Sequence, residues 1–330
     1  MTTPLWGRIA AAAALLFLIV TPQGLKPYGL LLLSQWAVFS IAAVGLNLTL
    51  GYAGQVSLAQ AAFLGVGAYT AALMTTHGWP LWSALLAAGA LGFAIGWVLG
   101  YPALRVQHHY LAFVTLAFTT LAFLVFRNET WLTGGVYGIN RIPRPTLLGW
   151  PTARDPLLFY YFCLAMLLLV LAGMWRLTRS PWGRAFIALR ENPIRASSLG
   201  VDTRAYTLLA FAIGAGLGAL AGALYAALVQ YIDPSSFTLA ESLKFLLMVV
   251  VGGSGYFLGP LVGSAISVLL PEWLRFTEGW YLILYAVLVM VLMAWCPSGL
   301  LGLLDRLVRR AQRLSHAAPA APLLGKEPGA

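Results

Sequence analysis

Charged residues are scarce in this chain. Asp, Glu, Lys and Arg together make up 9% of its 330 residues, whereas 60% are hydrophobic. Soluble domains carry roughly 25% charged residues, and a chain this apolar would need a core too large for its polar surface. The scarcity of charge excludes a soluble globular protein. It predicts an all-α, polytopic integral membrane protein that is embedded in the lipid bilayer.

Groups that carry chemistry are also scarce. The two cysteines, Cys163 and Cys296, give no disulfide framework, and the four histidines have no metal-binding spacing. The apolar segments hold almost no acids or histidines for a proton relay, and the sequence has no phosphate-binding loop and no visible nucleophile with a base. We therefore expect no metal, no cofactor and no enzymatic activity. A transporter built from this chain would take its energy from a partner.

The charge that is present is mostly basic, with a net of +10. No basic stripe is interleaved with stacking aromatic side chains, so nucleic acid is not an expected partner. In membrane proteins, Lys and Arg instead collect in cytoplasmic loops and fix the orientation of the chain. The basic residues are therefore interpreted as markers of topology.

The apolar residues fall into about ten transmembrane or re-entrant helical segments: 6–20, 28–50, 56–75, 81–103, 110–126, 157–175, 206–231, 242–251, 256–270 and 280–295. A spanning helix needs about 20 residues, so 242–251 is too short and is expected to form a broken or re-entrant pair with 256–270. The first segment resembles a signal peptide but lacks an Ala-x-Ala cleavage site, so we expect it to be retained. Residues 1–304 are expected to form one transmembrane domain, and 305–330 a tail.

Two clusters of arginine set the expected orientation. Residues 176–204, here called the basic block, hold six arginines and two acids, and the tail is also basic. Both are expected to be cytoplasmic, and the even number of segments between them allows this. Counting backwards places the N-terminus inside as well. The loop 127–155 then falls outside although it carries four arginines against two acids, which is an exception to the rule.

The basic block has the pattern of two capped helices. Ser180-Pro181 and Asn192-Pro193 each place a capping side chain before a proline, and Gly200 suits a left-handed closing position. Trp182, Phe186 and Leu189 are spaced to form one apolar face. The arginines, including Arg184 and Arg190, are expected to face outward. A loop that only fixes topology needs the charge but not the caps, whereas a docking surface needs both.

Small residues recur every four positions in three segments. These stripes are Gly92, Gly96 and Gly100; Gly214, Gly218 and Gly222; and Ser57, Ala61 and Gly65. Residues four apart share a helix face, so each stripe predicts a groove in which another backbone packs closely.

Two glycine-rich stretches interrupt the apolar pattern: "GLNLTLGYAGQVSLAQAAFLGVGAYT" (45–70) and "VVGGSGYFLGPLVGSA" (250–265). Such breaks in corresponding halves of a chain indicate a translocation path. The candidate path residues are Asn47, Gly51, Gly54, Gln55, Ser57, Gln60, Gly253 and Gly255. The polar ones could equally be hydrogen-bonding contacts between helices. Gln55 is the best single candidate for a polar contact, because the next helix is expected to begin just after it with unpaired N–H groups.

Glu241 and Lys244 are the main ionisable pair near an apolar segment. At this spacing they could neutralise each other on one helix face, or lie at the membrane interface, or serve transport.

The stretches "GYAGQVSLAQAAFLGVGAYTAAL", "LTGGVYGI", "GRAFIALRENPIRASSLGVDTRAYTLLAFAIGAGLGALAGALYA", "VVVGGSGYFLGPLVG" and "PSGLLGLL" resemble the M-type inner-membrane permeases of bacterial branched-chain amino acid ABC importers. The resemblance covers about residues 32–304. It implies an alternating-access permease for hydrophobic amino acids in the bacterial inner membrane. The implied partners are cytoplasmic ATP-binding subunits, a homologous second permease subunit and a periplasmic substrate-binding protein.

In that family, the loop matching 184–200 docks onto the ATPase subunit. The resemblance thus implies coupling roles for Arg184, Arg190, Glu191, Asn192, Arg195, Leu199 and Gly200. Two alternatives stay open at this point. One is a related ABC permease for urea or short amides. The other is a secondary transporter or channel that works without ATP.

Overall fold

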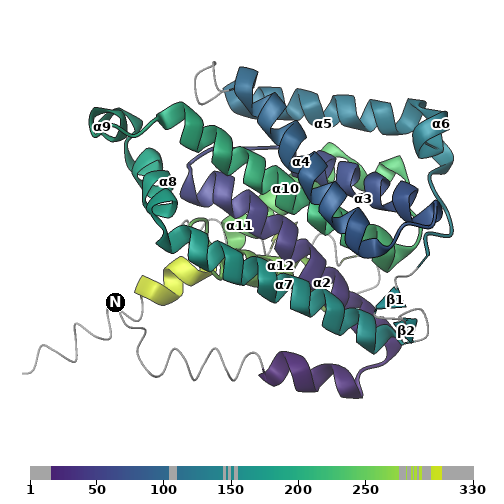
Figure 1. Cartoon of the computed structure of the whole chain (residues 1–330). Helices are drawn as coiled ribbons and strands as arrows, with labels where there is room; N and C mark the ends of the chain where they lie inside the picture. Colours follow the sequence, from purple (N-terminus) through teal and green to yellow (C-terminus); the bar gives the residue numbers. More distant parts are fainter. Residues whose placement is uncertain are drawn as a thin grey trace, which may run out of the picture.

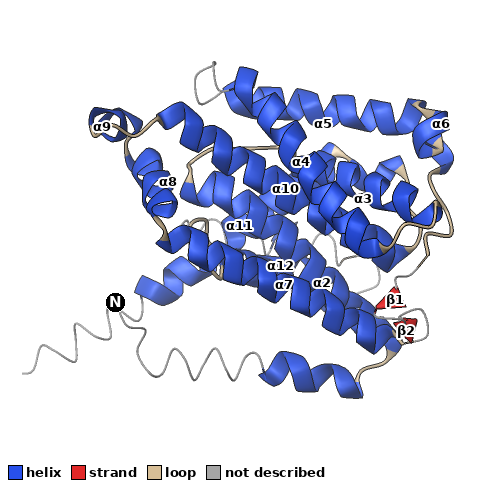
Figure 2. Ribbon diagram, viewed as in Figure 1, coloured by secondary structure: helices blue, strands red, loops and turns tan. Residues whose placement is uncertain are grey.

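The computed structural model describes residues 16–103, 110–143, 146–147, 150–151, 155–274, 280, 284, 286–287, 290–291 and 299–306. In chain order the elements are η1 (Thr21–Gly24), α2 (Pro27–Asn47), η2 (Leu48–Tyr52), α3 (Gln60–Thr76), α4 (Leu81–Ala103), α5 (Tyr110–Asn128), α6 (Thr130–Thr133), η3 (Gly135–Tyr137), β1 (Thr146–Leu147), β2 (Trp150–Pro151), α7 (Pro156–Arg179), α8 (Pro181–Glu191), α9 (Pro193–Ser198), α10 (Thr203–Val229), η4 (Pro234–Phe237), α11 (Leu239–Gly252) and α12 (Gly259–Trp273). The predicted all-α class is confirmed (Figure 2), with β1 and β2 as a two-residue antiparallel pair.

Five helical segments in the described part are long and apolar enough to cross a membrane: Pro27–Tyr52, Leu81–Pro102, Leu111–Asn128, Pro156–Arg179 and Thr203–Val229. Helices α3, α11 and α12 have 17, 14 and 15 residues. At 1.5 Å per residue, α11 is roughly 21 Å long and falls short of the roughly 30 Å of hydrocarbon in a bilayer. The prediction that this segment is too short to span is confirmed.

Helix α10 lies at the centre of the bundle. It makes its most extensive contacts with α4, α3 and α2, and Figure 1 shows it between α4 and α2. Helix α2 is apolar on all sides, and every residue from Trp36 to Asn47 is buried. A helix that is apolar all round needs neighbours or lipid on every side. α7 and α12 supply further neighbours to α2.

The bundle has two distinct ends. Helices α8 and α9 lie at one end, whereas α6, β1 and β2 lie at the other (Figure 1). At the second end, Ile139 and Ile232 form an isolated antiparallel bridge between the α5–α7 connection and the α10–α11 connection. The basic block and the loop 127–155 therefore lie at opposite ends of the bundle, as expected, and the cytoplasmic location of the basic block stays a prediction.

Several predictions lie outside the described residues. These are most of the first segment (6–15), the pair His108–His109, most of the last segment (280–295), Cys296 and the tail beyond 306.

Candidate functional site

The first glycine-rich stretch ends helix α2. The helix passes into the five-residue π-helix η2, and residues 54–59 then run without helix or strand until α3 begins at Gln60. Gly54 has a φ of +72°, a left-handed conformation that L side chains rarely adopt. The sequence predicted that this helix begins near Val56, just after Gln55. That prediction is wrong by four residues, because the chain turns at Gly54 and stays irregular up to Ala59.

Hydroxyl groups from other helices hold this irregular segment and the first turn of α3. The Thr115 hydroxyl accepts from the Leu58 N–H at 3.0 Å, and the Thr119 hydroxyl donates to the Leu58 carbonyl at 2.7 Å. Ser242 accepts from the Ala61 N–H at 3.0 Å. Non-helical backbone inside a membrane protein must be satisfied by such partners. These residues were not among the candidates from the sequence, although threonines four positions apart on an apolar helix could have indicated them.

The second glycine-rich stretch joins α11 to α12. Gly253 and Gly255 have φ values of +116° and +84°, so the turn between the helices needs glycine at both positions. A Cβ at Gly252 or Gly263 would collide with backbone of the opposite helix. The two short helices therefore pack as a close pair, as the sequence predicted.

The structure brings the two breaks together. Asn47, at the end of α2, donates from Nδ2 to the Tyr256 carbonyl at 3.1 Å and accepts at Oδ1 from the Gly255 N–H at 2.9 Å. A Cβ at Gly51 would collide with the Gly255 backbone. Asn47 thus connects the end of α2 to residues 208 and 209 positions further along the chain. Both polar atoms of its side-chain amide are hydrogen-bonded within the protein. This junction of the two breaks is here called the break junction.

Arg190 contacts the break junction. Its Nη1 donates to the Gly51 carbonyl oxygen, although the side chain as a whole remains exposed. Arg190 is exposed as predicted, but the sequence did not foresee this contact with Gly51. The contact is possible because Gly54 and Gly255 have no side chains there, which lets α8 and the Arg190 guanidinium approach the break junction closely.

The predicted caps of the basic block are confirmed. The Ser180 side chain accepts from the Trp182 N–H at 3.2 Å, and the Asn192 side chain accepts from the Arg195 N–H at 3.0 Å. Gly200 has a φ of +81°. Arg184, Glu191, Arg195 and Gly200 are exposed, Asn192 is half-buried, and Leu199 is 83% exposed.

The predicted apolar face of α8 needs one correction. Phe186 and Leu189 are buried, but Trp182 is 49% exposed. Trp182 lies in the first turn, where it borders an open cavity that also involves Gly173, Arg176 and Leu177 of α7. Gly183 and Ala185 complete the buried side of the helix instead.

The remaining polar path residues differ in how they are satisfied. Gln60 Nε2 donates to the Ala42 carbonyl at 2.7 Å, and Ser57 accepts from the Ala59 N–H at 3.3 Å. Both contacts stabilise the fold. Gln55 is 4% exposed, and its Oε1 has no hydrogen-bond partner within the described structure. Its backbone N–H, expected to be near a free helix start, donates to the Thr49 carbonyl at 2.8 Å.

The glycine stripes lie at helix contacts. Gly92, Gly96 and Gly100 of α4 face Ala219, Ala215 and Leu208 of α10, and a Cβ at any of them would collide with these side chains. Gly214, Gly218 and Gly222 lie on the opposite side of α10 and face α2 and α3. Gly65 of the third stripe faces Phe126 and Phe237.

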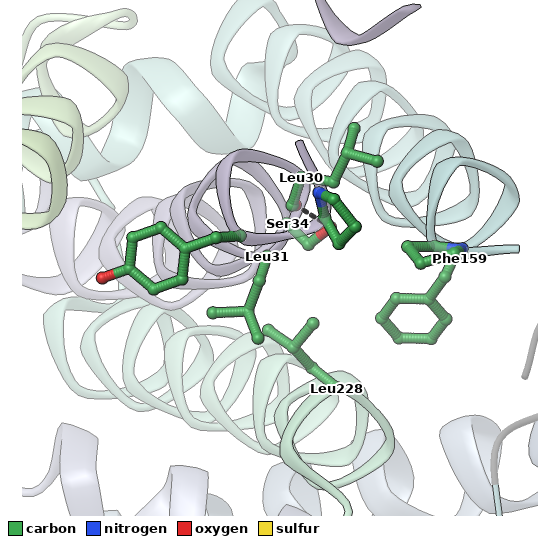
Figure 3. A pocket seen from close by; sticks show the side chains of 8 residues that line it. Leu30, Leu31, Ser34, Phe159 and Leu228 are labelled. Carbon is green, nitrogen blue, oxygen red and sulfur yellow. Dashed lines mark hydrogen bonds between the residues drawn. The ribbon is translucent and has the colours of Figure 1, made fainter. Parts of the chain in front are cut away.

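A cavity of about 290 Å³ lies between α2, α7 and α10, far along these helices from the basic block. Figure 3 shows Leu30, Leu31, Phe159 and Leu228 around it. Ser34 also lines it, but its hydroxyl donates to the Leu30 carbonyl at 2.8 Å. The cavity is mainly apolar and is separate from the break junction.

Ionisable groups form no metal-like cluster among the described residues. Glu241 and Lys244 form an ion pair at 3.4 Å, with both side chains about one third exposed. Lys244 also lies 5.5 Å from the Phe39 ring centre. The pair thus neutralises itself on one face of α11.

Comparisons with known proteins place this arrangement among transport permeases. Residues 29–293 match the family described as branched-chain amino acid transport system / permease component. The chain is 36% identical over 289 residues to the high-affinity branched-chain amino acid transport system permease protein LivM of Escherichia coli K12, covering 80% of this chain and 68% of that protein.

Two further relatives are less similar in sequence. A probable branched-chain amino acid transport permease protein LivM of Methanocaldococcus jannaschii is 29% identical over 240 residues, covering 66% of this chain and 67% of that protein. The autoinducer 2 import system permease protein LsrC of Salmonella typhimurium is 28% identical over 336 residues, covering 95% and 92%. No solved structure gives a significant match.

Proposed function

The chain belongs to the branched-chain amino acid transport permease family, and we propose that it is one of two permease subunits of an ATP-driven importer for branched-chain, hydrophobic amino acids. It is a multi-pass protein of the inner membrane and a permease component. The proposed partners are cytoplasmic ATP-binding subunits, a homologous permease subunit and a periplasmic substrate-binding protein.

The basic block is the observation that carries this proposal. It consists of two capped helices at one end of the bundle, with Arg184, Glu191, Arg195 and Leu199 exposed. A sequence without a phosphate-binding loop needs another subunit to bind ATP. We propose that these residues form the docking surface for that subunit, and that its closure on ATP moves α8 and α9 to alternate access across the membrane.

The proposed substrate follows from chemistry as well as from relatives. Two of the relatives above are named as branched-chain amino acid permeases. A path with few ionisable groups suits an aliphatic side chain, and neutral dipoles or helix ends can hold a zwitterion's charges. Gln55 Oε1 is an acceptor without a partner, so we propose that it receives the substrate's ammonium group. A urea permease and an ATP-independent carrier or channel are less well supported.

The experiment uses the tagged chain with its companions. An ATPase and a second permease should co-purify with it. Glu191→Ala and Arg195→Ala should lower substrate-stimulated ATP hydrolysis and uptake together, by roughly tenfold, because each removes part of a charged interface. Arg204→Ala is the matched control, since Arg204 is an exposed arginine in the first turn of α10, outside the two short helices.

Two outcomes would contradict the proposed function. Uptake by the chain reconstituted alone would show an ATP-independent carrier. Normal uptake in both the Glu191 and Arg195 variants at matched membrane levels would remove the docking role of these positions.

A further inference from the structure

The basic block and the two glycine-rich breaks are separate stretches of the sequence. In the structure, one side chain of the block contacts the break junction. Arg190 lies in the last turn of α8, and its Nη1 donates to the carbonyl oxygen of Gly51 in η2. The two residues are 139 positions apart. Among the exposed arginines of the block, Arg190 is thus placed to act toward the bundle.

Glycines make this contact possible on both sides. A Cβ at Gly54 would lie 3.3 Å from the Arg190 Cα, which is tighter than ordinary van der Waals contact. A Cβ at Gly255 would collide with Arg190 Nη1 itself. The guanidinium therefore fits between the first break and the α11–α12 turn, and a side chain at Gly255 would displace it.

The contact reaches both breaks at once. Asn47 binds the Gly255 N–H and the Tyr256 carbonyl, so the turn is joined to the end of α2 by two hydrogen bonds. Gly299 adds a fourth segment, since a Cβ there would collide with Gly253. Through Arg190, α8 is therefore in contact with the two places where the described helices are interrupted.

We propose that Arg190 is a positioning residue that transmits movement of the docking helices to the break junction, rather than a part of the docking surface. This inference rests on the proposed function, in which ATP moves the basic block. A charged donor suits the role because a guanidinium can hold a backbone carbonyl and keep its remaining donors solvated. Lysine keeps the charge but not the planar fork.

The first test needs no ATPase. In a chain with Cys163 and Cys296 replaced by Ala, Ser254→Cys places a thiol in the α11–α12 turn, where Ser254 is half-buried. Maleimide labelling in inside-out membrane vesicles measures how open the turn is. Arg190→Gln should raise the labelling rate at least about threefold, Arg190→Lys should raise it less, and Arg204→Gln, at an exposed arginine outside the two short helices, should leave it unchanged. Equal rates in all variants would overturn the inference.

The second test uses the complete transporter in proteoliposomes. Arg190→Gln should lower uptake about tenfold or more while the ATPase subunit still co-purifies in the normal ratio, and Arg190→Lys should restore part of the uptake. If Arg190→Gln released the ATPase subunit, Arg190 would belong to the docking surface and the inference would be wrong. If no ATPase co-purified even with the unaltered chain, the proposed function would fail, and the labelling test alone would decide the contact. If Arg190→Gln did not accumulate in membranes, Arg190→Lys would carry both tests.

Discussion

Gln55 differs from the other polar candidates of the proposed path in its hydrogen bonding. Asn47, Ser57 and Gln60 all have partners inside the protein, whereas the buried Oε1 of Gln55 has none within the described structure. An unsatisfied buried acceptor costs about 1–3 kcal/mol. We propose that the substrate satisfies this atom; the hydroxyl of Tyr69 and Oε2 of Glu241 are the other buried side-chain atoms of the described residues without a partner.

The Gln55→Leu variant tests this reading through two opposite effects. Leucine removes the unsatisfied oxygen at similar volume, so the thermal midpoint in detergent should stay the same or rise. Uptake should fall by roughly tenfold to a hundredfold, because a hydrogen bond to a charged group contributes about 1.5–3 kcal/mol. Full uptake would place the path elsewhere, whereas a lower midpoint with reduced uptake would indicate a structural role.

Asp233 lies in the connection between α10 and α11 and gives a prediction about pH. Partial burial raises the pKa of its carboxyl group, but hydrogen bonds from Ser235 and Ser236 outweigh this and hold the pKa below its ordinary value. A carboxylate whose pKa is lower in the folded state stabilises the fold above its unfolded pKa, and that stabilisation is lost as the pH falls through the folded value.

The expected result is a steeper acid loss of stability in the unaltered chain than in Asp233→Asn. Thermal midpoints should be compared from neutral pH down through roughly pH 5 to 3, the range around the ordinary aspartate pKa. The gap between the two proteins should be widest near neutral pH and should narrow as the pH falls. A constant gap would mean that the carboxylate charge does not contribute.

At the scale of elements, α10 owes its central position to small residues on two sides. On one side, Ala215 and Ala219 of α10 contact α4. On the other side, Gly214, Gly218 and Gly222 contact α2 and α3. Without a hydrophobic driving force between helices in lipid, close backbone contact supplies much of the association. A bulky side chain in this stripe therefore has to separate helices.

Gly218→Leu should destabilise the bundle by at least about 1–3 kcal/mol, the usual cost of overpacking. A Cβ at this position would already lie 2.8 Å from Gln60 Nε2 and 3.2 Å from Phe63 Cβ. The measurement is the thermal midpoint in detergent. Gly173→Leu is the matched control, because Gly173 lies in α7 with nothing within 4 Å of its Cβ position. Equal midpoints for the two variants would show that α10 tolerates bulk at this contact.

At the scale of the whole molecule, exposed aromatic residues mark both ends of the bundle. Trp82 near the start of α4 and Trp97 and Tyr101 near its end are all exposed, with the apolar Leu86 and Val98 also exposed along it. Trp and Tyr are enriched at membrane–water interfaces. The aromatic residues therefore agree with a membrane between the α8–α9 end and the end that holds η4.

The proposed orientation places the α8–α9 end in the cytoplasm. In a chain with Cys163 and Cys296 replaced by Ala, Ser235→Cys should react with a membrane-impermeant maleimide in intact cells. Ser197→Cys should react only after the cells are opened. Both serines are exposed, so access through the membrane is what differs. Reversed labelling would invert the topology and place the basic block outside.

Much of the fold is determined by the sequence alone, since its causes are local. Long apolar runs define the membrane class, and a cap depends on residues only a few positions apart. Ser180, Asn192 and Gly200 therefore act as predicted. The repeats of small residues indicated which helix faces meet another backbone, although they did not identify the partner helix.

Only the tertiary structure decided how the breaks are used. The contact between Asn47 and Tyr256 joins residues 209 positions apart, and Arg190 contacts Gly51 because glycines in two other segments leave room for it. The late start of α3 at Gln60 depends on hydroxyls of Thr115 and Thr119, which α5 brings alongside the irregular segment before it. These partners come from distant parts of the chain. The local sequence therefore does not determine which hydrogen-bond donor contacts which acceptor after the helices pack.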